Sequence, residues 1–153
     1  MLPRRLLFTL AFLAPSAASA RIFTERGLAL RGTDVVAYFT EGRLQRGRPE
    51  HAVEWEGARW LFASAANRAR FLADPAAHAP AYGGFCAWAV AQGYTAPTDP
   101  AAWRVVEGRL FLNYSQAIKR RWERDIPGLI VAGDANWPRL SQNGLSQSGS
   151  GQS

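Results

Sequence analysis

Cys86 is the only cysteine in the 153-residue chain and the first candidate for chemistry. It follows the pair Gly83-Gly84 and precedes an apolar run. If Gly84 caps a helix, Cys86 lies in the first turn, where free backbone N–H groups and the helix dipole favour the thiolate. Free cysteine is also among the residue types most often buried in a core. The sequence leaves both interpretations open: a reactive thiol or metal ligand, and a small core residue.

His78 is the second candidate, because it precedes Cys86 across a glycine-containing turn that could fold back. Thiolate and imidazole ligands suit both Cu(I) and Zn(II). A closed structural zinc site needs about four ligands, and the chain adds only His51 and carboxylates. If the pair binds a metal, the ligands therefore favour two-coordinate copper over tetrahedral zinc. The alternative is an exposed histidine at a helix end, near the C-terminal dipole.

Two β-hairpins are predicted around Glu56-Gly57 and Glu107-Gly108, because glycine supplies the positive φ of a tight turn. We expect both hairpins to pair antiparallel within one small sheet. A further strand is predicted over 34–40, which is β-branched and aromatic. Apart from the likeness of the two hairpins, we expect no internal repeat.

Helices are predicted between and after the hairpins. Ser64 is a good N-cap for a helix over 65–72, and Asp74-Pro75 can cap a short one that ends at His78. The further predicted helices cover 84–92, which is apolar on all sides, 116–126 after the cap Ser115, and the segment from Pro127 to about Trp137-Pro138. The expected fold class is α+β, with a small antiparallel sheet of two hairpins packed against several helices.

The N-terminal residues have the features of a secretory signal peptide. Arg4-Arg5 precedes a short apolar run, and Ala18-Ser19-Ala20 matches the pattern that signal peptidase cleaves. We expect a signal peptide over 1–20, a domain over 21–138, a disordered tail over 139–153, and a periplasmic or secreted mature protein. The export route, general secretory or twin-arginine, stays open. The apolar run is too short to span a bilayer, which takes about 20 residues, so no membrane span is expected after cleavage.

The remaining composition limits the partners and the core. Hydrophobic residues make up 48% of the chain, enough for one sizeable core. Despite the formal net charge of +6, no basic stripe with interleaved aromatics is present, so no nucleic-acid partner is expected. Tyr38, Tyr82, Tyr94 and Tyr114 are expected in the core rather than around a pocket. The basic segment 119–124 is expected to be a solvated helix face.

Several segments in order resemble the secreted branch of the YHS-domain family. They are Gly57–Ser64, then Asp74-Pro75, then Tyr82-Gly83-Gly84 with Cys86, and finally Asn136-Trp137-Pro138, within a likeness over about residues 30–138. The resemblance implies a cysteine after the double glycine, matched by Cys86. In metal-binding relatives, cysteines lie in the hairpin and at the start of the next helix. The matching stretch 62–67 has none, so metal binding cannot be carried over from the resemblance.

Three functions follow as hypotheses. The leading one is an exported, soluble YHS-type binding module that handles a soft metal such as copper through Cys86 and His78. The second is a thiol-dependent redox enzyme with Cys86 as its catalytic residue and the resolving thiol on another molecule. The third is a structural partner-binding domain in which Cys86 is core.

Overall fold

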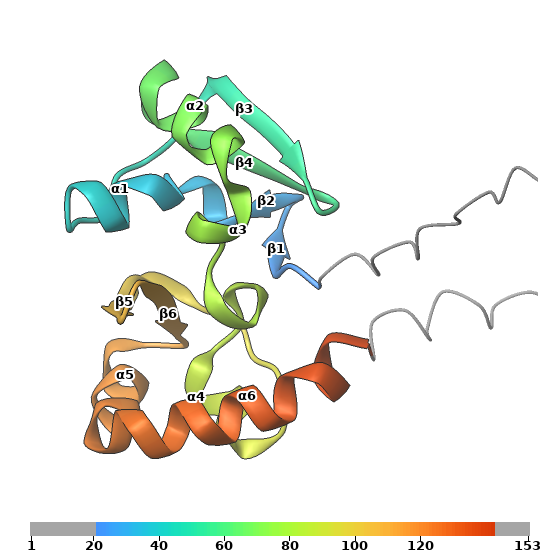
Figure 1. Cartoon of the computed structure of the whole chain (residues 1–153), viewed down its shortest axis with the longest axis vertical. Helices are drawn as coiled ribbons and strands as arrows, with labels where there is room; N and C mark the ends of the chain where they lie inside the picture. The colour runs from blue at the N-terminus through green and yellow to red at the C-terminus, as the bar shows by residue number, and fades with distance from the viewer. Residues whose placement is uncertain (1–20, 143–153) are drawn as a thin grey trace, which may run out of the picture.

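The computed structural model describes residues 21–142, so the predicted signal peptide and most of the predicted tail lie outside the described residues. The chain mixes helices and strands, and the predicted α+β class is confirmed. Figure 1 shows a first lobe above and a second lobe below, joined by the segment that follows α3. The first lobe contains β1 (Thr24–Glu25), β2 (Leu28–Ala29), η1 (Leu30–Gly32), α1 (Val35–Thr40), β3 (Arg48–Trp55), β4 (Ala58–Phe62), α2 (Ala65–Ala73) and α3 (Pro75–His78).

The second lobe holds the remaining elements. They are η2 (Ala81–Gly84), α4 (Ala87–Gln92), β5 (Asp99–Val106), β6 (Arg109–Asn113), α5 (Gln116–Trp122), η3 (Glu123–Asp125) and α6 (Ile126–Gln142). The helices predicted at 65–72 and up to His78 are confirmed as α2 and α3. The helix predicted after Ser115 ends at Trp122 and is followed by η3 and α6. Residues 139–142 belong to α6, and Leu140 packs in the core. The expectation that the disordered tail begins at residue 139 is therefore wrong.

The strand predicted over 34–40 is wrong, because Val35–Thr40 forms the helix α1. Asp34 caps this helix: one carboxylate oxygen accepts hydrogen bonds from the backbone N–H groups of Val36 at 2.9 Å and Ala37 at 3.3 Å. The β-branched and aromatic residues of this segment are there because the helix is buried, not because it is a strand: Val35 and Val36 are 0% exposed. A short helix that is apolar on all sides has a composition that a buried strand shares.

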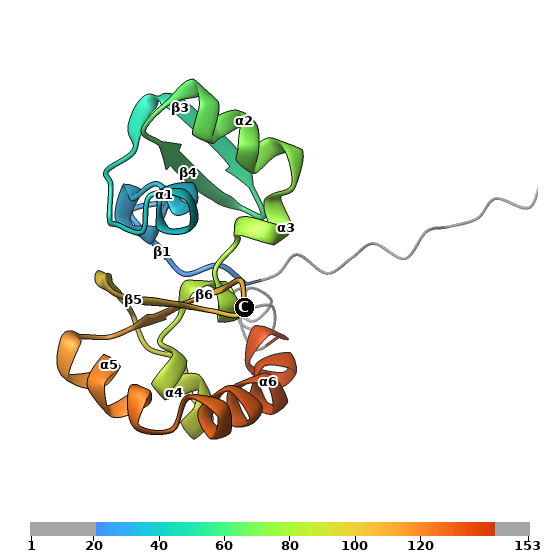
Figure 2. The ribbon, with the colours of Figure 1, turned by 60° about the vertical axis from the view of Figure 1, so that its left-hand side comes forward.

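Both predicted hairpins form, but they lie in separate sheets. The first sheet is four-stranded in the order β1-β2-β4-β3, and β5-β6 forms a two-stranded sheet of its own. The expectation of one sheet is wrong, because the second hairpin does not hydrogen-bond to the first along a strand edge. It packs instead with one face against the first lobe and the other against the second. Successive side chains of a strand point to opposite faces: Leu110 and Leu112 join the core of the first lobe, and Phe111 joins that of the second. Figure 2 shows β5-β6 as a layer between the first lobe and the helices of the second.

The two lobes repeat one another, so the expectation of no internal repeat beyond the likeness of the hairpins is wrong. In each, a 3-10 helix, a short α-helix, a hairpin and a second α-helix follow in the same order. Both hairpins have strands of eight and five residues and a register shift near the start of the first strand. The corresponding pairs are η1 with η2, α1 with α4, β3 with β5, β4 with β6 and α2 with α5.

Backbone conformation supports the repeat in detail. Three successive residues with positive φ precede each first helix: Leu30–Gly32, at 53°, 52° and 83°, and Tyr82–Gly84, at 56°, 62° and 83°. Left-handed conformations are uncommon for residues other than glycine, so the recurrence of such a triplet is specific. The residue that caps the helix after each triplet, Asp34 or Cys86, donates its backbone N–H across the lobe, to the carbonyl oxygens of Gln45 at 2.8 Å and Ala96 at 3.0 Å.

The first described residues belong to the second lobe. The backbone N–H of Phe23 donates to the carbonyl oxygen of Gly83 at 2.9 Å. The guanidinium of Arg21 lies 4.7 Å above the Phe85 ring and donates to the carbonyl oxygen of Leu140 at 3.3 Å. A Cβ at Gly83 would overlap the carbonyl oxygen of Arg21, so the close approach of the N-terminal segment requires glycine. Both ends of the described chain accordingly lie on the same side of the molecule (Figure 1).

Candidate functional site

Cys86 lies at the N-cap of α4 rather than in its first turn. The left-handed residues Tyr82–Gly84 delay the start of the helix to Ala87, so the helix expected from residue 84 is wrong at that end. The cysteine is 1% exposed. Its sulfur accepts a hydrogen bond from the backbone N–H of Tyr114 at 3.3 Å, and its S–H donates to Oδ1 of Asn113 at 3.6 Å.

The thiol of Cys86 is held in its neutral form. Burial raises the pKa of the thiol, because an apolar environment disfavours the thiolate. Hydrogen bonding to the backbone N–H groups of Ala89, Tyr114 and Trp88 lowers the pKa, but by less than burial raises it. Of the two interpretations that the sequence leaves open, the burial of Cys86 therefore favours a core residue over a thiolate stabilised at a helix N-terminus.

Above the thiol lies a pocket of about 230 Å³. Two of its lining residues, Cys86 and Ala89, are buried, and the others are Trp88, Tyr94, Ala96, Tyr114 and Ile118. Tyr94 and Tyr114 are 52% and 58% exposed, so these two tyrosines form open walls rather than core, which corrects the expectation. Tyr38 and Tyr82 are buried, as expected. We call this cavity the Cys86 pocket.

An arginine lies next to Trp88, one of the walls of the Cys86 pocket. The guanidinium of Arg121 lies 5.7 Å from the centre of the Trp88 ring. Arg120 and Arg121 are exposed on α5, and Arg124 is exposed in η3, so the predicted solvated face is confirmed for these residues. None of the lining side chains is acidic. The lining itself is therefore uncharged, and Arg121 places a positive charge beside Trp88.

Asn113 connects the pocket to the hairpin. It is 0% exposed, and its Oδ1 also accepts the backbone N–H of Trp88 at 3.1 Å, which fastens the start of α4 to the end of β6. Its Nδ2 has no hydrogen-bond partner among the described residues, and neither has Nε1 of Trp122. The sequence analysis did not single out Asn113; a polar residue directly after the apolar run Leu110–Leu112 is the signal that could have found it.

The first lobe has the same arrangement without the pocket. Asp34 occupies the position of Cys86, and its second oxygen accepts the backbone N–H of Ala63 at 2.8 Å, just as the sulfur accepts that of Tyr114. Asn67 occupies the position of Ile118, since the backbone N–H of each donates to the hydroxyl oxygen of its helix cap, Ser64 or Ser115.

The side chains at these positions behave differently. Nδ2 of Asn67 reaches down to Asp34 at 2.8 Å and is itself buried. Ile118 has no group that could bind Cys86 in this way, and it lines the pocket instead. The space above the capping residue is thus closed by a hydrogen-bonded amide in the first lobe and open in the second.

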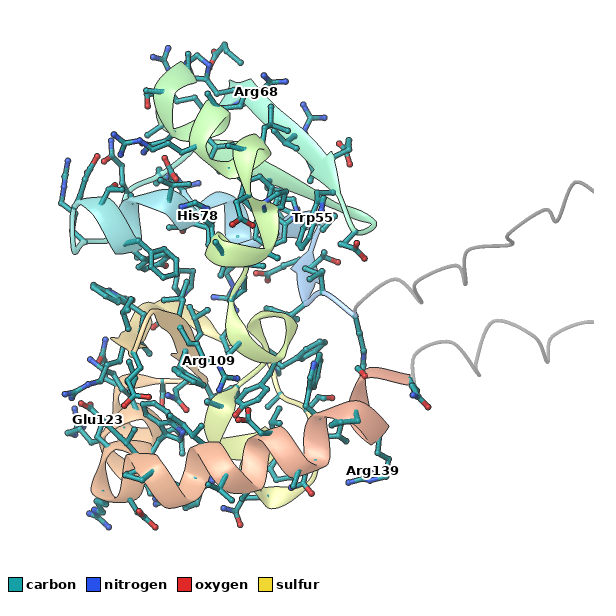
Figure 3. The ribbon with its side chains drawn as sticks, viewed as in Figure 1. Trp55, Arg68, His78, Arg109, Glu123 and Arg139 are labelled. Atoms are coloured by element: carbon teal, nitrogen blue, oxygen red, sulfur yellow. The ribbon has the colours of Figure 1, made fainter. Side chains whose placement is uncertain are left out.

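His78, the second predicted ligand, lies away from Cys86. It ends α3 in the first lobe (Figure 3), where Nδ1 is 3.0 Å from the carbonyl oxygen of Asp74 and the ring stands edge-on to Phe39, with centroids 5.6 Å apart. It does not line the Cys86 pocket. The structure therefore does not bring the two predicted copper ligands together, and the alternative of a histidine at a helix end describes its position.

The described residues offer no other metal cluster. Residues 21–142 contain no group of three or more histidine, cysteine or acidic side chains that could hold a metal ion. Within the Cys86 pocket the thiol is joined only by tyrosine hydroxyls as possible ligands, and soft Cu(I) prefers thiolate, thioether or imidazole. The residues of this pocket do not fit a copper site.

A polar network at the junction of the lobes was also missed by the sequence analysis. The hydroxyl of Tyr82 donates to Asp134 at 2.9 Å, and Arg109 donates to both oxygens of that carboxylate, at 2.9 and 3.1 Å. Arg109 holds the pKa of Asp134 below its usual range, and burial raises the pKa of Tyr82. Figure 3 shows Arg109 on the second lobe, where it lines a cavity of about 370 Å³ together with Trp55 and alanines of α3 and of the segment that follows it.

No protein-family model, curated protein or solved structure matches the chain. Among residues 21–142, no helix is both long and apolar enough to cross a membrane.

Proposed function

We propose that the chain is an exported binding domain, similar to the secreted branch of the YHS-domain family, whose ligand site is the Cys86 pocket. One observation carries the proposal: the same scaffold occurs twice, and the space above the capping residue is closed by Asn67 in one copy and left open by Ile118 in the other. Binding sites for small molecules are concave, mostly apolar and lined by aromatic side chains. The Cys86 pocket has these properties.

The state of the thiol favours binding over catalysis. A nucleophilic cysteine needs a lowered pKa or an adjacent base. The pKa of Cys86 is raised by burial, and the other lining residues include no histidine, lysine or carboxylate. The role of Cys86 in this proposal is that of a polarizable, neutral surface at the base of the pocket.

The proposal is tested by titrating the 15N-labelled protein with benzyl alcohol, a neutral aromatic probe, and following amide chemical shifts. We expect saturable shifts centred on Trp88, Tyr94 and Tyr114. Ile118→Asn installs the residue of the first lobe, so it replaces an apolar wall of the pocket by a polar amide and should reduce affinity for the probe at least about tenfold, or about 1.4 kcal/mol. Ala117→Asn, at an exposed neighbour outside the pocket, is the matched control and should bind like the unsubstituted protein.

Shifts that do not saturate, or equal affinities in Ile118→Asn and Ala117→Asn, would contradict a ligand site in this pocket. A parallel titration with Cu(I) tests the metal hypothesis. Tight binding that Cys86→Ser abolishes and Ile118→Asn preserves would favour metal handling over the proposal.

A further inference from the structure

The Cys86 pocket has the dimensions of a site for one aromatic ring. An apolar cavity of about 150 Å³ is large enough to bind benzene. The Cys86 pocket, at about 230 Å³, leaves room for a ring and a short substituent. Two exposed tyrosines, Tyr94 and Tyr114, and the half-buried Trp88 supply aromatic faces for such a ring. Offset or edge-to-face contacts between aromatic rings stabilise a bound ring beyond its burial.

The state of the nearby arginine distinguishes the Cys86 pocket from the cavity that Arg109 lines. Arg109, which lines the cavity of about 370 Å³, is neutralised by Asp134. Arg121 forms no ion pair within residues 21–142; its one described contact is with the ring of Trp88. Glu123, an acidic residue on the same side of the molecule, already pairs with Arg104 and Lys119. The positive charge beside Trp88 is thus available to an anion.

We propose that the pocket binds a small aromatic carboxylate, with the ring against Cys86 between the tyrosines and the carboxylate paired with Arg121. This inference rests on the proposed function and adds the class of ligand. The planar guanidinium suits a carboxylate because it can donate two parallel hydrogen bonds to it. Helix α4, which carries Trp88, and α5, which carries Arg121, lie side by side below the hairpin (Figure 2), and the guanidinium lies 5.7 Å from the centre of the Trp88 ring.

The test compares phenylacetate with phenylacetamide, which has nearly the same shape and no charge, by NMR titration at low ionic strength. We expect phenylacetate to bind about three- to fivefold more tightly, the range of a partly exposed ion pair. Arg121→Gln should remove this difference while leaving the affinity for phenylacetamide unchanged. Arg120→Gln is the matched control, since Arg120 is the exposed neighbour on α5 with no described ring contact, and it should keep the difference.

Equal affinities for the two probes in the unsubstituted protein would overturn the carboxylate assignment and leave the proposed pocket standing, because phenylacetamide still reports on it. An equal loss of preference in Arg120→Gln and Arg121→Gln would also overturn it, since general attraction to a basic helix would then explain the result. Loss of phenylacetamide binding in Ile118→Asn separates the pocket itself from the charge. If neither probe binds, the proposed function fails together with the inference.

Discussion

The two lobes place different chemistry on one backbone design. In the first, Asp34 is enclosed by four hydrogen bonds, from Val36, Ala37, Ala63 and Asn67. In the second, Cys86 keeps the corresponding bond from the backbone after the hairpin and lies beneath an open pocket. The capping position after the left-handed triplet can therefore serve the fold or a ligand. One side chain on the facing helix decides which role is available.

The cores next to the caps differ in the same sense. Phe62 and Phe71 pack with their ring centroids 5.0 Å apart in the first lobe. Asn113 and Trp122 occupy the corresponding positions in the second, and each has a buried N–H group without a described partner. An unpaired buried donor costs about 1–3 kcal/mol. The lobe with the pocket is therefore the less optimised of the two for stability, as is common around functional sites.

The largest expected effect is that of breaking the closed cap. Asp34→Ala removes the acceptor of the four hydrogen bonds from Val36, Ala37, Ala63 and Asn67. The backbone N–H groups among these donors are then left buried without a partner. We expect the free energy of unfolding to fall by about 4 kcal/mol, a value reached by adding the loss of a helix cap to that of charged hydrogen bonds. Urea denaturation measures it. Asp34→Asn keeps one acceptor oxygen and should lose clearly less, and a loss below about 1 kcal/mol in Asp34→Ala would contradict the closed-cap description.

An intermediate effect concerns the pH dependence that Cys86 adds. Because its pKa is raised in the folded state, the folded protein holds the thiol proton at pH values where the unfolded chain releases it, above about 8.5. Stability is then unaffected below that pH and falls as the pH rises toward the folded-state pKa. Unfolding measured between about pH 7 and pH 10 should show a steeper decline than in Cys86→Ala.

The same property predicts the reactivity of the thiol. Iodoacetamide should modify Cys86 slowly in the folded protein near neutral pH and rapidly after denaturation, as followed by intact-mass spectrometry. Fast modification of the folded protein would show that the thiolate is accessible, and it would revive the redox hypothesis.

The smallest expected effect lies in a feature of the second lobe alone. Arg109 pairs with Asp134, whereas Ala58 opens the corresponding strand of the first lobe. Both charged side chains are nearly half exposed, so despite the bidentate geometry we expect a coupling energy of only about 0.5 kcal/mol in a double-mutant cycle of Arg109→Met and Asp134→Asn. A coupling above about 2 kcal/mol would show that this pair, rather than packing, holds α6 to the hairpin.

Local signals in the sequence predicted much of the fold. The Glu-Gly turns place both hairpins, and the caps Ser64, Asp74 and Ser115 place the starts of the helices that follow them. The same kind of signal was available at Asp34. It was overlooked because the residues that follow it are buried on all sides and compete as a strand.

The site was harder to predict, for two physical reasons. The positive φ of Tyr82 is imposed by tertiary packing, and nothing in a tyrosine indicates it, so the start of α4 and the place of Cys86 were misjudged. Nearness in sequence also did not bring His78 to Cys86, since the chain passes from one lobe to the other between them. The pocket itself depends on Ile118 standing where the first lobe has Asn67. That exchange becomes visible only when the lobes are superimposed.

The placement of Arg21–Phe23 within the second lobe has a consequence for the order of folding. These residues precede the first lobe in the chain, yet their contacts are with Gly83, Phe85 and Leu140, which lie far along the sequence. Contacts between such distant positions slow folding, because the entropy of closing the intervening chain is lost before these contacts can stabilise the fold. We therefore expect the first lobe to form before Arg21–Phe23 dock onto the second lobe. The chain is then completed by a closing step in which its two ends meet.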